Sequence, residues 1–465
     1  MLTDFLSNKI TENFPFPPTE EQANLISELS AFLLSRESHE AFLLKGFAGT
    51  GKTTVISALV RTHVALQQNC VLLAPTGRAA KVFANYSGEK ALTIHKKIYR
   101  QKPDGAFGLN FNQHKHTLFI VDEASMIGNN NEGSTFGSGF LLDDLIDYVY
   151  QGENCRLLLV GDTAQLPPVM QPFSPALERT KLESYGLNVR EFLLINVLRQ
   201  AHESGILFNA TALRKQISDE KVNVFPKFKT KGFSDIKRLS GEDFVDAINT
   251  SYREVGIEET IVVTRSNKAA NVYSFGIRNR VLYKEDQITN GDLLMITRNN
   301  YFWGEQYEGL DFIANGDMAE IVRVGRFYEM YGYQFADLTL RLLDYEMEID
   351  ARVLLDTLAA DTPAAAAALN QTLFTRVQED YMHIGNKRER YRAMRQDPYL
   401  CALQVKFAYA VTCHKAQGGQ WAHVYIEQGQ VTEEMLGIDY YRWLYTALTR
   451  AKEKVFLVNF PETVS

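Results

Sequence analysis

The segment 41-AFLLKGFAGTGKTTVISALV-60 constrains the fold more than any other part of the chain. Its first residues form a short apolar run typical of a buried strand, and its last apolar residues recur on one face of a helix. Between them, residues 46–53 match G-x-x-x-x-G-K-T. Glycines let backbone N–H groups curl around phosphate oxygens, and the following helix adds the positive end of its dipole. The segment therefore predicts a phosphate-binding loop.

Two side chains of this loop carry most of its chemistry. Lys52 supplies a positive charge to the β- and γ-phosphates of a nucleotide, and the Thr53 hydroxyl can ligate Mg²⁺. We expect the other contacts to the nucleotide to come from Gly46, Ala48, Gly49, Thr50, Gly51 and Thr54.

Two later strand-like runs end in polar residues suited to the same site. The run 117-TLFIVDEASM-126 ends in Asp122, which can hold the water shell of Mg²⁺, and Glu123, which can orient and deprotonate an attacking water. The run 156-RLLLVGDTAQLPPV-169 leads to Gln165, which can sense the γ-phosphate. Taken singly, these are also the solvated ends of buried strands. Together with the phosphate loop, they predict a doubly wound α/β core with the ligand at the strand C-terminal ends.

Composition limits the other classes of protein. The N-terminus lacks a basic start followed by an apolar run, so we expect no signal peptide, and no apolar stretch approaches the roughly 20 residues of a membrane span. Four dispersed cysteines argue against a disulfide scaffold or zinc site and favour a reducing cytoplasm. The formal net charge of −7 requires any nucleic acid to bind in a local groove.

Eight blocks in order resemble the superfamily 1 helicases, and most closely their RecD-like and Dda-like branch, superfamily 1B. The blocks are GFAGTGKTT, 74-APTGRAAKV-82, 92-LTIH-95, VDEAS, GDTAQLPPV, 198-LRQ-200, 409-YAVTCHKAQGGQW-421 and 445-YTALTRAKE-453. The resemblance spans nearly the whole chain. It implies an α/β fold with two RecA-like P-loop NTPase domains, a small hairpin insertion in the first and an SH3-like β-barrel insertion in the second.

The resemblance also implies roles for single residues. Gln22 would read adenine, and Gln165 would couple the γ-phosphate to motion. Arg199 and Arg450 resemble arginine fingers, for which the planar and permanently charged guanidinium is suited, although either arginine taken alone is as compatible with a surface salt bridge. The expected catalytic residues are Lys52, Glu123, Gln165, Arg199 and Arg450.

The block 409–421 places a cysteine beside a histidine. We read residues 406–412 as one strand, so Cys413 and His414 would point to opposite faces and would not form a dyad; no third ligand or acid supports a metal or protease site. Cys413 is expected in the core. The resemblance assigns Gln417 and Gly418 to the ATP cleft, and the expected contacts with nucleic acid come from Pro75, Thr76, Arg78, Thr93, His95, Phe111, Thr412, His414 and Lys415.

The expected domains follow from these positions. Residues 1–185 form the first RecA-like domain, with a hairpin insertion at about 97–116; residues 186–317 and 405–465 form the second, and residues 318–404 are its barrel and helical insertion. Asp104-Gly105 predicts the hairpin turn. Phe111, with Phe107 as second choice, is the predicted pin that stacks on the last base pair of a duplex. Both rings are equally compatible with packing onto their own domain.

The 318–404 insertion begins with strand-like alternation that suggests a small antiparallel barrel and then becomes helical. Its basic run 386-NKRERYRAMR-395 can hold phosphates, but such a run is more typical of a solvated helix face.

We therefore expect an ATP- and Mg²⁺-dependent DNA helicase that moves 5′ to 3′ on single-stranded DNA, with the direction implied by the resemblance. The alternatives are an RNA-directed superfamily 1 helicase and an ATP-dependent nucleic-acid-binding switch that does not unwind. The expected partners are single-stranded DNA and single/double-strand junctions, with no membrane, and single-stranded-DNA-binding or repair proteins in DNA repair or recombination. The expected state is a cytoplasmic monomer.

Overall fold

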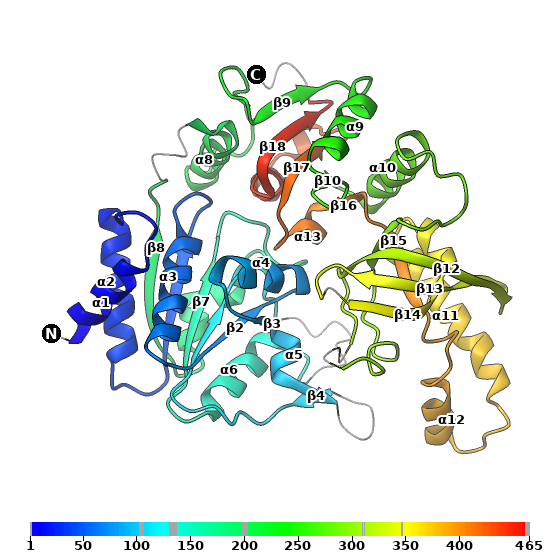
Figure 1. Ribbon diagram of the computed structural model, residues 1–465, viewed down its shortest axis with the longest axis horizontal. Helices are drawn as coiled ribbons and strands as arrows, with labels where there is room; N and C mark the ends of the chain where they lie inside the picture. The colour runs from blue at the N-terminus through cyan, green and yellow to red at the C-terminus, as the bar shows by residue number, and fades with distance from the viewer. Residues whose placement is uncertain are drawn as a thin grey trace.

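The computed structural model describes residues 2–101, 107–129, 137–197, 203–308, 310, 312–345 and 347–460. They form two lobes, each built on a parallel β-sheet, and a closed barrel beside the second lobe (Figure 1). Arg199 and the predicted Asp104-Gly105 turn lie outside the described residues. No described helix is long and apolar enough to cross a bilayer.

The first lobe is a six-stranded sheet in the order β3-β2-β6-β7-β1-β8, and every pairing in it is parallel. Its strands are β1 (Glu40–Gly46), β2 (Cys70–Ala74), β3 (Ala91–Thr93), β6 (Leu118–Val121), β7 (Arg156–Gly161) and β8 (Asn188–Leu194). Its helices are α1 (Leu2–Glu12), α2 (Glu20–Leu34), α3 (Lys52–Ala65), α4 (Gly77–Ser87), α5 (Ile94–Ile98), α6 (Leu141–Gln151) and α7 (Arg179–Glu183).

Alternation along β1 shows why this sheet is buried on both faces. Ala41 and Leu43 join one core cluster, and Phe42 and Leu44 join the other, because successive strand side chains point to opposite faces. One correction concerns the domain boundary. β8 pairs with β1, so the first sheet runs past residue 185, where we expected the first domain to end.

The second lobe is a five-stranded parallel sheet in the order β16-β10-β17-β18-β9. Its strands are β9 (Ile236–Leu239), β10 (Thr260–Thr264), β16 (Ala410–Thr412), β17 (Trp421–Glu427) and β18 (Ala451–Val458). Its helices are α8 (Gly205–Ser218), α9 (Phe244–Glu254), α10 (Asn267–Arg280), α13 (Cys413–Ala416) and α14 (Ile438–Leu448). The two parallel sheets confirm the predicted pair of RecA-like cores.

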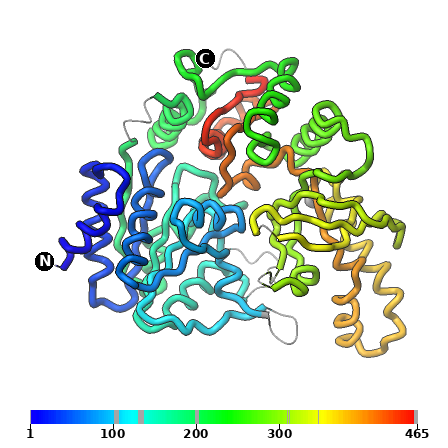
Figure 2. The backbone as a smooth tube through the Cα atoms, in the orientation of Figure 1, coloured from blue at the N-terminus to red at the C-terminus, as the bar shows by residue number. Residues whose placement is uncertain are grey.

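The barrel is closed by β11 (Leu293–Ile296), β12 (Met318–Met330), β13 (Tyr333–Leu342), β14 (Met347–Leu354) and β15 (Leu403–Phe407). It confirms the predicted class of insertion and corrects two details. Its first strand, β11, precedes residue 318, and β14 pairs with β15 in parallel, so the barrel is not wholly antiparallel. Helices α11 (Pro363–Asp380) and α12 (Lys387–Met394) form an arm that projects beyond the barrel (Figure 2).

Residues 406–412, predicted as a single strand, belong to two. β15 ends at Phe407 in the barrel, and β16 begins at Ala410 in the second sheet. The chain therefore passes from one body to the other at residues 408–409. In the first lobe, β4 (Tyr99–Gln101) and β5 (Phe107–Leu109) form the predicted antiparallel hairpin.

Candidate functional site: a nucleotide cleft between the lobes

The phosphate loop joins the C-terminal end of β1 to the first residue of α3. Gly49 and Gly51 have φ of 78° and 88°, values that favour glycine. Gly46 lies so close to the Lys52 side chain that a Cβ there would be 2.8 Å from Lys52 Cγ. Lys52 Nζ donates to the carbonyl oxygens of Gly46 at 2.7 Å and Phe47 at 2.9 Å, which holds the ammonium inside the loop. The predicted cradle is thus formed, with Thr53 exposed at its rim.

The two acids stand directly after β6, as predicted. Asp122 Oδ2 accepts a 2.6 Å hydrogen bond from the Tyr86 hydroxyl of α4. Glu123 adopts φ of 52°, a left-handed conformation that is uncommon outside glycine. Burial raises the pKa of both carboxyls. Tyr86 was missed by the sequence analysis, because nothing local signals that a helix residue reaches the acid of another strand.

The second lobe reaches across to the phosphate loop through Tyr445 of α14. The Tyr445 hydroxyl donates to Asp162 Oδ2 at 2.6 Å and accepts from the Ala48 N–H at 2.8 Å. One residue on, the Thr446 hydroxyl accepts from the Leu166 N–H at 2.8 Å. The sequence analysis missed both residues, although they begin the block that contains Arg450. These bonds bring the two lobes together directly over the loop.

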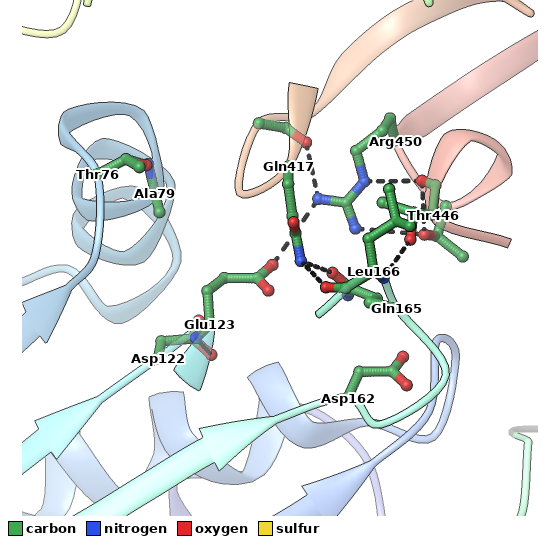
Figure 3. Close-up of polar contacts among 12 residues, drawn as sticks. Thr76, Ala79, Asp122, Glu123, Asp162, Gln165, Leu166, Gln417, Thr446 and Arg450 are labelled. Carbon is green, nitrogen blue, oxygen red and sulfur yellow. Dashed lines mark hydrogen bonds and ion pairs between the residues drawn. The ribbon is translucent and has the colours of Figure 1, made fainter. Parts of the chain in front are cut away.

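Arg450 lies in the same interface (Figure 3). It is 3% exposed, and it donates to Thr446 O at 3.0 Å and Gly419 O at 3.2 Å. Its NH1 lies 3.8 Å from Glu123 Oε1. The structure therefore brings the predicted arginine finger beside the predicted base, while the other predicted finger, Arg199, is outside the described residues.

Two glutamines from opposite lobes also meet where the lobes touch. Gln417 Nε2 donates to Leu166 O at 2.8 Å and lies 3.5 Å from Gln165 Oε1 (Figure 3). Gln22, the third predicted glutamine, donates to Thr50 O at 3.3 Å and accepts from Thr19 N at 3.0 Å. Gln22 therefore ties α2 to the phosphate loop, and its predicted part in reading adenine stays a prediction.

The expected strand contacts of the first lobe are found at helix N-termini. The Thr76 and Thr93 hydroxyls accept from Ala79 N at 3.2 Å and Lys96 N at 3.1 Å, as N-caps do. Burial lowers the pKa of His95 to about 4, so its imidazole is neutral at pH 7. Pro75, which precedes the N-cap Thr76, is half-buried.

Arg78 faces the second lobe instead of solvent. Its guanidinium lies 4.0 Å from the centre of the Trp421 ring and donates to Gln420 O at 3.2 Å. A Cβ at Gly418 would lie 2.9 Å from Ala79 Cβ, and one at Gly419 would lie 2.8 Å from Arg78 Nε. The glycine turn thus packs against the start of α4, while Gln417 just before it contacts Leu166 and Gln165 of the first lobe.

The cysteine–histidine pair is separated, for a reason other than the predicted one. Both residues lie on the short helix α13 and not on a strand. Cys413 is 1% exposed, with its thiol 3.5 Å from Trp443 O, and burial raises its pKa to about 12. His414 and Lys415 are exposed, and Lys415 Nζ donates to Asn315 Oδ1. Cys413 is thus a core residue, as predicted, and Thr412 is the N-cap of α13.

The hairpin phenylalanines have different surroundings. Phe107 is 8% exposed, and its ring lies 4.7 Å from that of Tyr301 between centroids, so it packs its hairpin against a loop beside the barrel. Phe111 is 64% exposed and follows β5 at the base of the hairpin. The structure leaves Phe111 accessible to a duplex and Phe107 inaccessible.

The residues expected to hold a cation offer oxygen ligands. The Thr53 hydroxyl and the Asp122 carboxylate are hard ligands of the kind Mg²⁺ prefers, and Mg²⁺ commonly takes only one or two protein ligands beside phosphate and water. Among the described residues, no group of three or more histidines, cysteines or acids forms a metal cage. The site fits a metal that arrives with a nucleotide.

Comparisons with known proteins match segments from both lobes. Residues 19–225 match a family model described as an AAA domain, and residues 407–458 match a UvrD-like helicase C-terminal domain. The ATP-dependent RecD2 DNA helicase of Deinococcus radiodurans is 34% identical over 151 residues, covering 32% of this chain and 18% of that protein. The RecD subunit of the RecBCD enzyme of Mycobacterium tuberculosis is 29% identical over 37% of this chain and 31% of its own length.

Longer matches are more distant. An uncharacterised protein of Acanthamoeba polyphaga mimivirus is 22% identical, covering 91% of this chain and 96% of its own. A solved Pif1 helicase from Bacteroides aligns over 95% of this chain and 92% of its own, with 15% identity and a TM-score of 0.47. The matched ATPase segment holds the phosphate loop and both acids, and the matched C-terminal segment holds Gln417, Tyr445 and Arg450. The family-model matches and the RecD2 relative together support a superfamily 1B helicase of the RecD-like kind.

Proposed function

We propose that this protein hydrolyses ATP to move 5′ to 3′ along single-stranded DNA as a monomer and to separate the strands of a duplex. The observation that carries the proposal is that three side chains of the second lobe converge on the first: Tyr445 on the phosphate loop, Arg450 on Glu123, and Gln417 on the loop that follows β7. A nucleotide bound there contacts both lobes. Its hydrolysis therefore changes how they pack.

The chain's own residues have separable parts in this scheme. Lys52 exchanges its bonds to the loop carbonyls for the β- and γ-phosphates. Glu123 orients and deprotonates the attacking water, and Arg450 neutralises charge that develops on the transferring phosphoryl group. Arg199 is proposed as the second arginine finger. Thr53 and Asp122 would hold Mg²⁺, which would supply electrostatic stabilisation of the phosphate oxygens.

Coupling to the strand follows from the glycine turn. Gln417 lies in the cleft, and the glycines after it pack on α4, whose N-cap Thr76 is an expected strand contact. His414 and Lys415 expose polar groups just before the same turn. Contacts of this kind to the backbone of the strand do not depend on its sequence.

A comparison of three tailed duplexes tests the proposal. With ATP present, we expect strand separation from a 5′ DNA tail and not from a 3′ DNA tail or an RNA tail. Unwinding from the RNA tail favours an RNA-directed enzyme, and stimulated phosphate release without strand separation favours a switch that only clamps. Failure of a single-stranded oligonucleotide to raise the rate of phosphate release contradicts the proposal.

The pin assignment has its own test. Phe111→Ala should keep DNA-stimulated hydrolysis and lose unwinding, because the exposed ring no longer stacks on the terminal base pair. Phe5→Ala is the matched control, since Phe5 is 49% exposed on α1, on the opposite side of the first lobe (Figure 1). Unwinding at the wild-type rate by Phe111→Ala rules out this residue as the pin.

A further inference from the structure

Helix α12 concentrates positive charge in a chain whose formal net charge is −7. Lys387, Arg388, Arg390 and Arg392 lie on the helix and Arg395 caps it, with Glu389 as the helix's single acid. Three of the arginines, at 388, 392 and 395, follow the i, i+4, i+7 spacing that places them on one face. We call these three residues the arginine stripe.

Residues beside and opposite the stripe anchor α12, which fixes where the stripe points. Met394 is 1% exposed, and the Tyr391 ring stacks on Phe374 of α11 with centroids 6.0 Å apart. Arg390 Nε donates to Ile384 O at 3.2 Å. All three stripe residues are exposed. Within the described residues, the guanidinium groups of Arg388 and Arg392 have neither an ion pair nor a hydrogen bond.

A continuous series of contacts ties the stripe to the β4–β5 hairpin. At the end of α12, Arg395 O accepts from the Cys401 thiol at 3.1 Å. Cys401 O in turn accepts from Trp303 Nε1 at 2.8 Å, in the loop that also carries Tyr301. Tyr301 packs on Phe107 of the hairpin. The arm and the hairpin project from the same side of the molecule (Figure 2).

We propose that the arginine stripe binds the phosphate backbone of the duplex that enters ahead of the hairpin. Residues four apart on a helix are about 6 Å apart along its axis, so successive guanidinium groups can reach successive phosphates. Arginine forms bidentate, charge-assisted bonds to phosphate, and such contacts position a duplex without reading its sequence. An acidic protein segment has similar charge, but the location on the same side of the molecule as the hairpin favours the duplex. The proposal rests on the unwinding function.

Equilibrium binding without nucleotide tests the stripe. The variant combines Arg388→Ala with Arg392→Ala, and the matched control combines Arg253→Ala with Arg280→Ala, two exposed arginines of the second lobe. Each protein is titrated with a single-stranded oligonucleotide and with the same oligonucleotide joined to a duplex, over a range of salt. We expect the stripe variant to bind the tailed duplex about tenfold more weakly or worse, with a slope of log K against log salt smaller by about 2. Its single-strand binding and the control variant should match wild type.

Three results would overturn the stripe proposal: wild-type affinity and slope in the variant, an equal loss on the single strand, or no gain by wild type from the added duplex. Competition by polyglutamate that requires the stripe, with duplex binding unchanged, would indicate an acidic protein partner instead. These titrations involve no hydrolysis. A failure of the proposed function appears separately, as wild type without single-strand-stimulated phosphate release.

Discussion

In each of the two parallel sheets, one strand leads to a helix that begins with a hydroxyl N-cap. The sheets differ in the loops that follow their other strands. In the first lobe, β2 leads to α4 through the N-cap Thr76, and in the second, β10 leads to α10 through the N-cap Ser266, whose hydroxyl accepts from Ala269 N at 3.1 Å. Among the described strands, β1 of the first sheet alone leads to a glycine loop with a lysine at the helix start. The nucleotide chemistry is therefore asymmetric.

Because of this asymmetry, the two lobes contribute different groups to the site. The first lobe supplies a cradle and two acids whose positions depend on its own backbone. The second supplies Tyr445, which contacts the phosphate loop, and Arg450, which contacts Glu123, and both contacts require the lobes to be together. We expect changes in the phosphate loop to lower ATP hydrolysis most and changes at Tyr445 or Arg450 to lower it less.

The greatest loss of activity should come from the phosphate loop itself. Lys52→Ala should lower ATP hydrolysis by about 10³-fold, because the ammonium held inside the loop is lost from the phosphates of the nucleotide. Lys268, exposed near the start of α10, is the positional counterpart in the second lobe. Lys268→Ala should hydrolyse ATP at the wild-type rate. Comparable losses, measured as phosphate release at saturating oligonucleotide, would mean that both sheets bind nucleotide.

A smaller loss of ATP hydrolysis is expected when Arg450, the side chain of the second lobe that contacts Glu123, is changed. Arg450→Lys keeps a cation but loses the planar fork, so kcat should fall by about 10²-fold while KM for ATP changes little. Steady-state kinetics separate the two parameters, and an unchanged melting temperature shows that the loss of bonds to Thr446 O and Gly419 O has not unfolded the site. A rise in KM at constant kcat would make Arg450 a binding residue.

Removing the Tyr445 hydroxyl should lower ATP hydrolysis less than the change at Arg450. Tyr445→Phe leaves Asp162 and the Ala48 N–H without their shared hydroxyl, at a cost of about 1–3 kcal/mol to lobe closure, so kcat/KM for ATP should fall about tenfold. Tyr441→Phe is the control, because the Tyr441 hydroxyl donates to Val224 O at 2.7 Å, away from the cradle. Equal behaviour of the two variants would exclude Tyr445 from the coupling.

These same residues show which parts of the site can be predicted from the sequence. The phosphate loop and both acids were predictable, because a strand, a glycine turn and a helix follow each other within one segment and fix the geometry locally. Tyr445 was not, since its partner Asp162 lies 283 residues away and no periodicity links them. A block shared with a family marks such a residue as near a site and does not say which atoms it meets.

The split between β15 and β16 marks a different limit. Residues 406–412 read as one uninterrupted strand, yet Tyr409 O accepts from Val262 N of the second sheet at 3.1 Å, while Phe407 remains in the barrel. A strand-like sequence predicts that successive side chains point to opposite faces of a sheet. It does not tell which sheet the strand joins. The early start of the barrel at β11 and the extra strand β8 were missed for the same reason.

The mildest loss should occur at Arg78, which resemblance assigns to the nucleic acid and which the structure stacks on Trp421. A cation–π contact of about 1 kcal/mol predicts that Arg78→Gln lowers kcat at saturating oligonucleotide about fivefold, with affinity for the strand and its salt slope unchanged. If Arg78 instead binds a phosphate, the same variant should bind the strand more weakly and flatten the salt slope by about 1. Salt-dependent binding alongside hydrolysis decides between them. The first outcome makes the start of α4 a link between the lobes, and the second makes it part of the track.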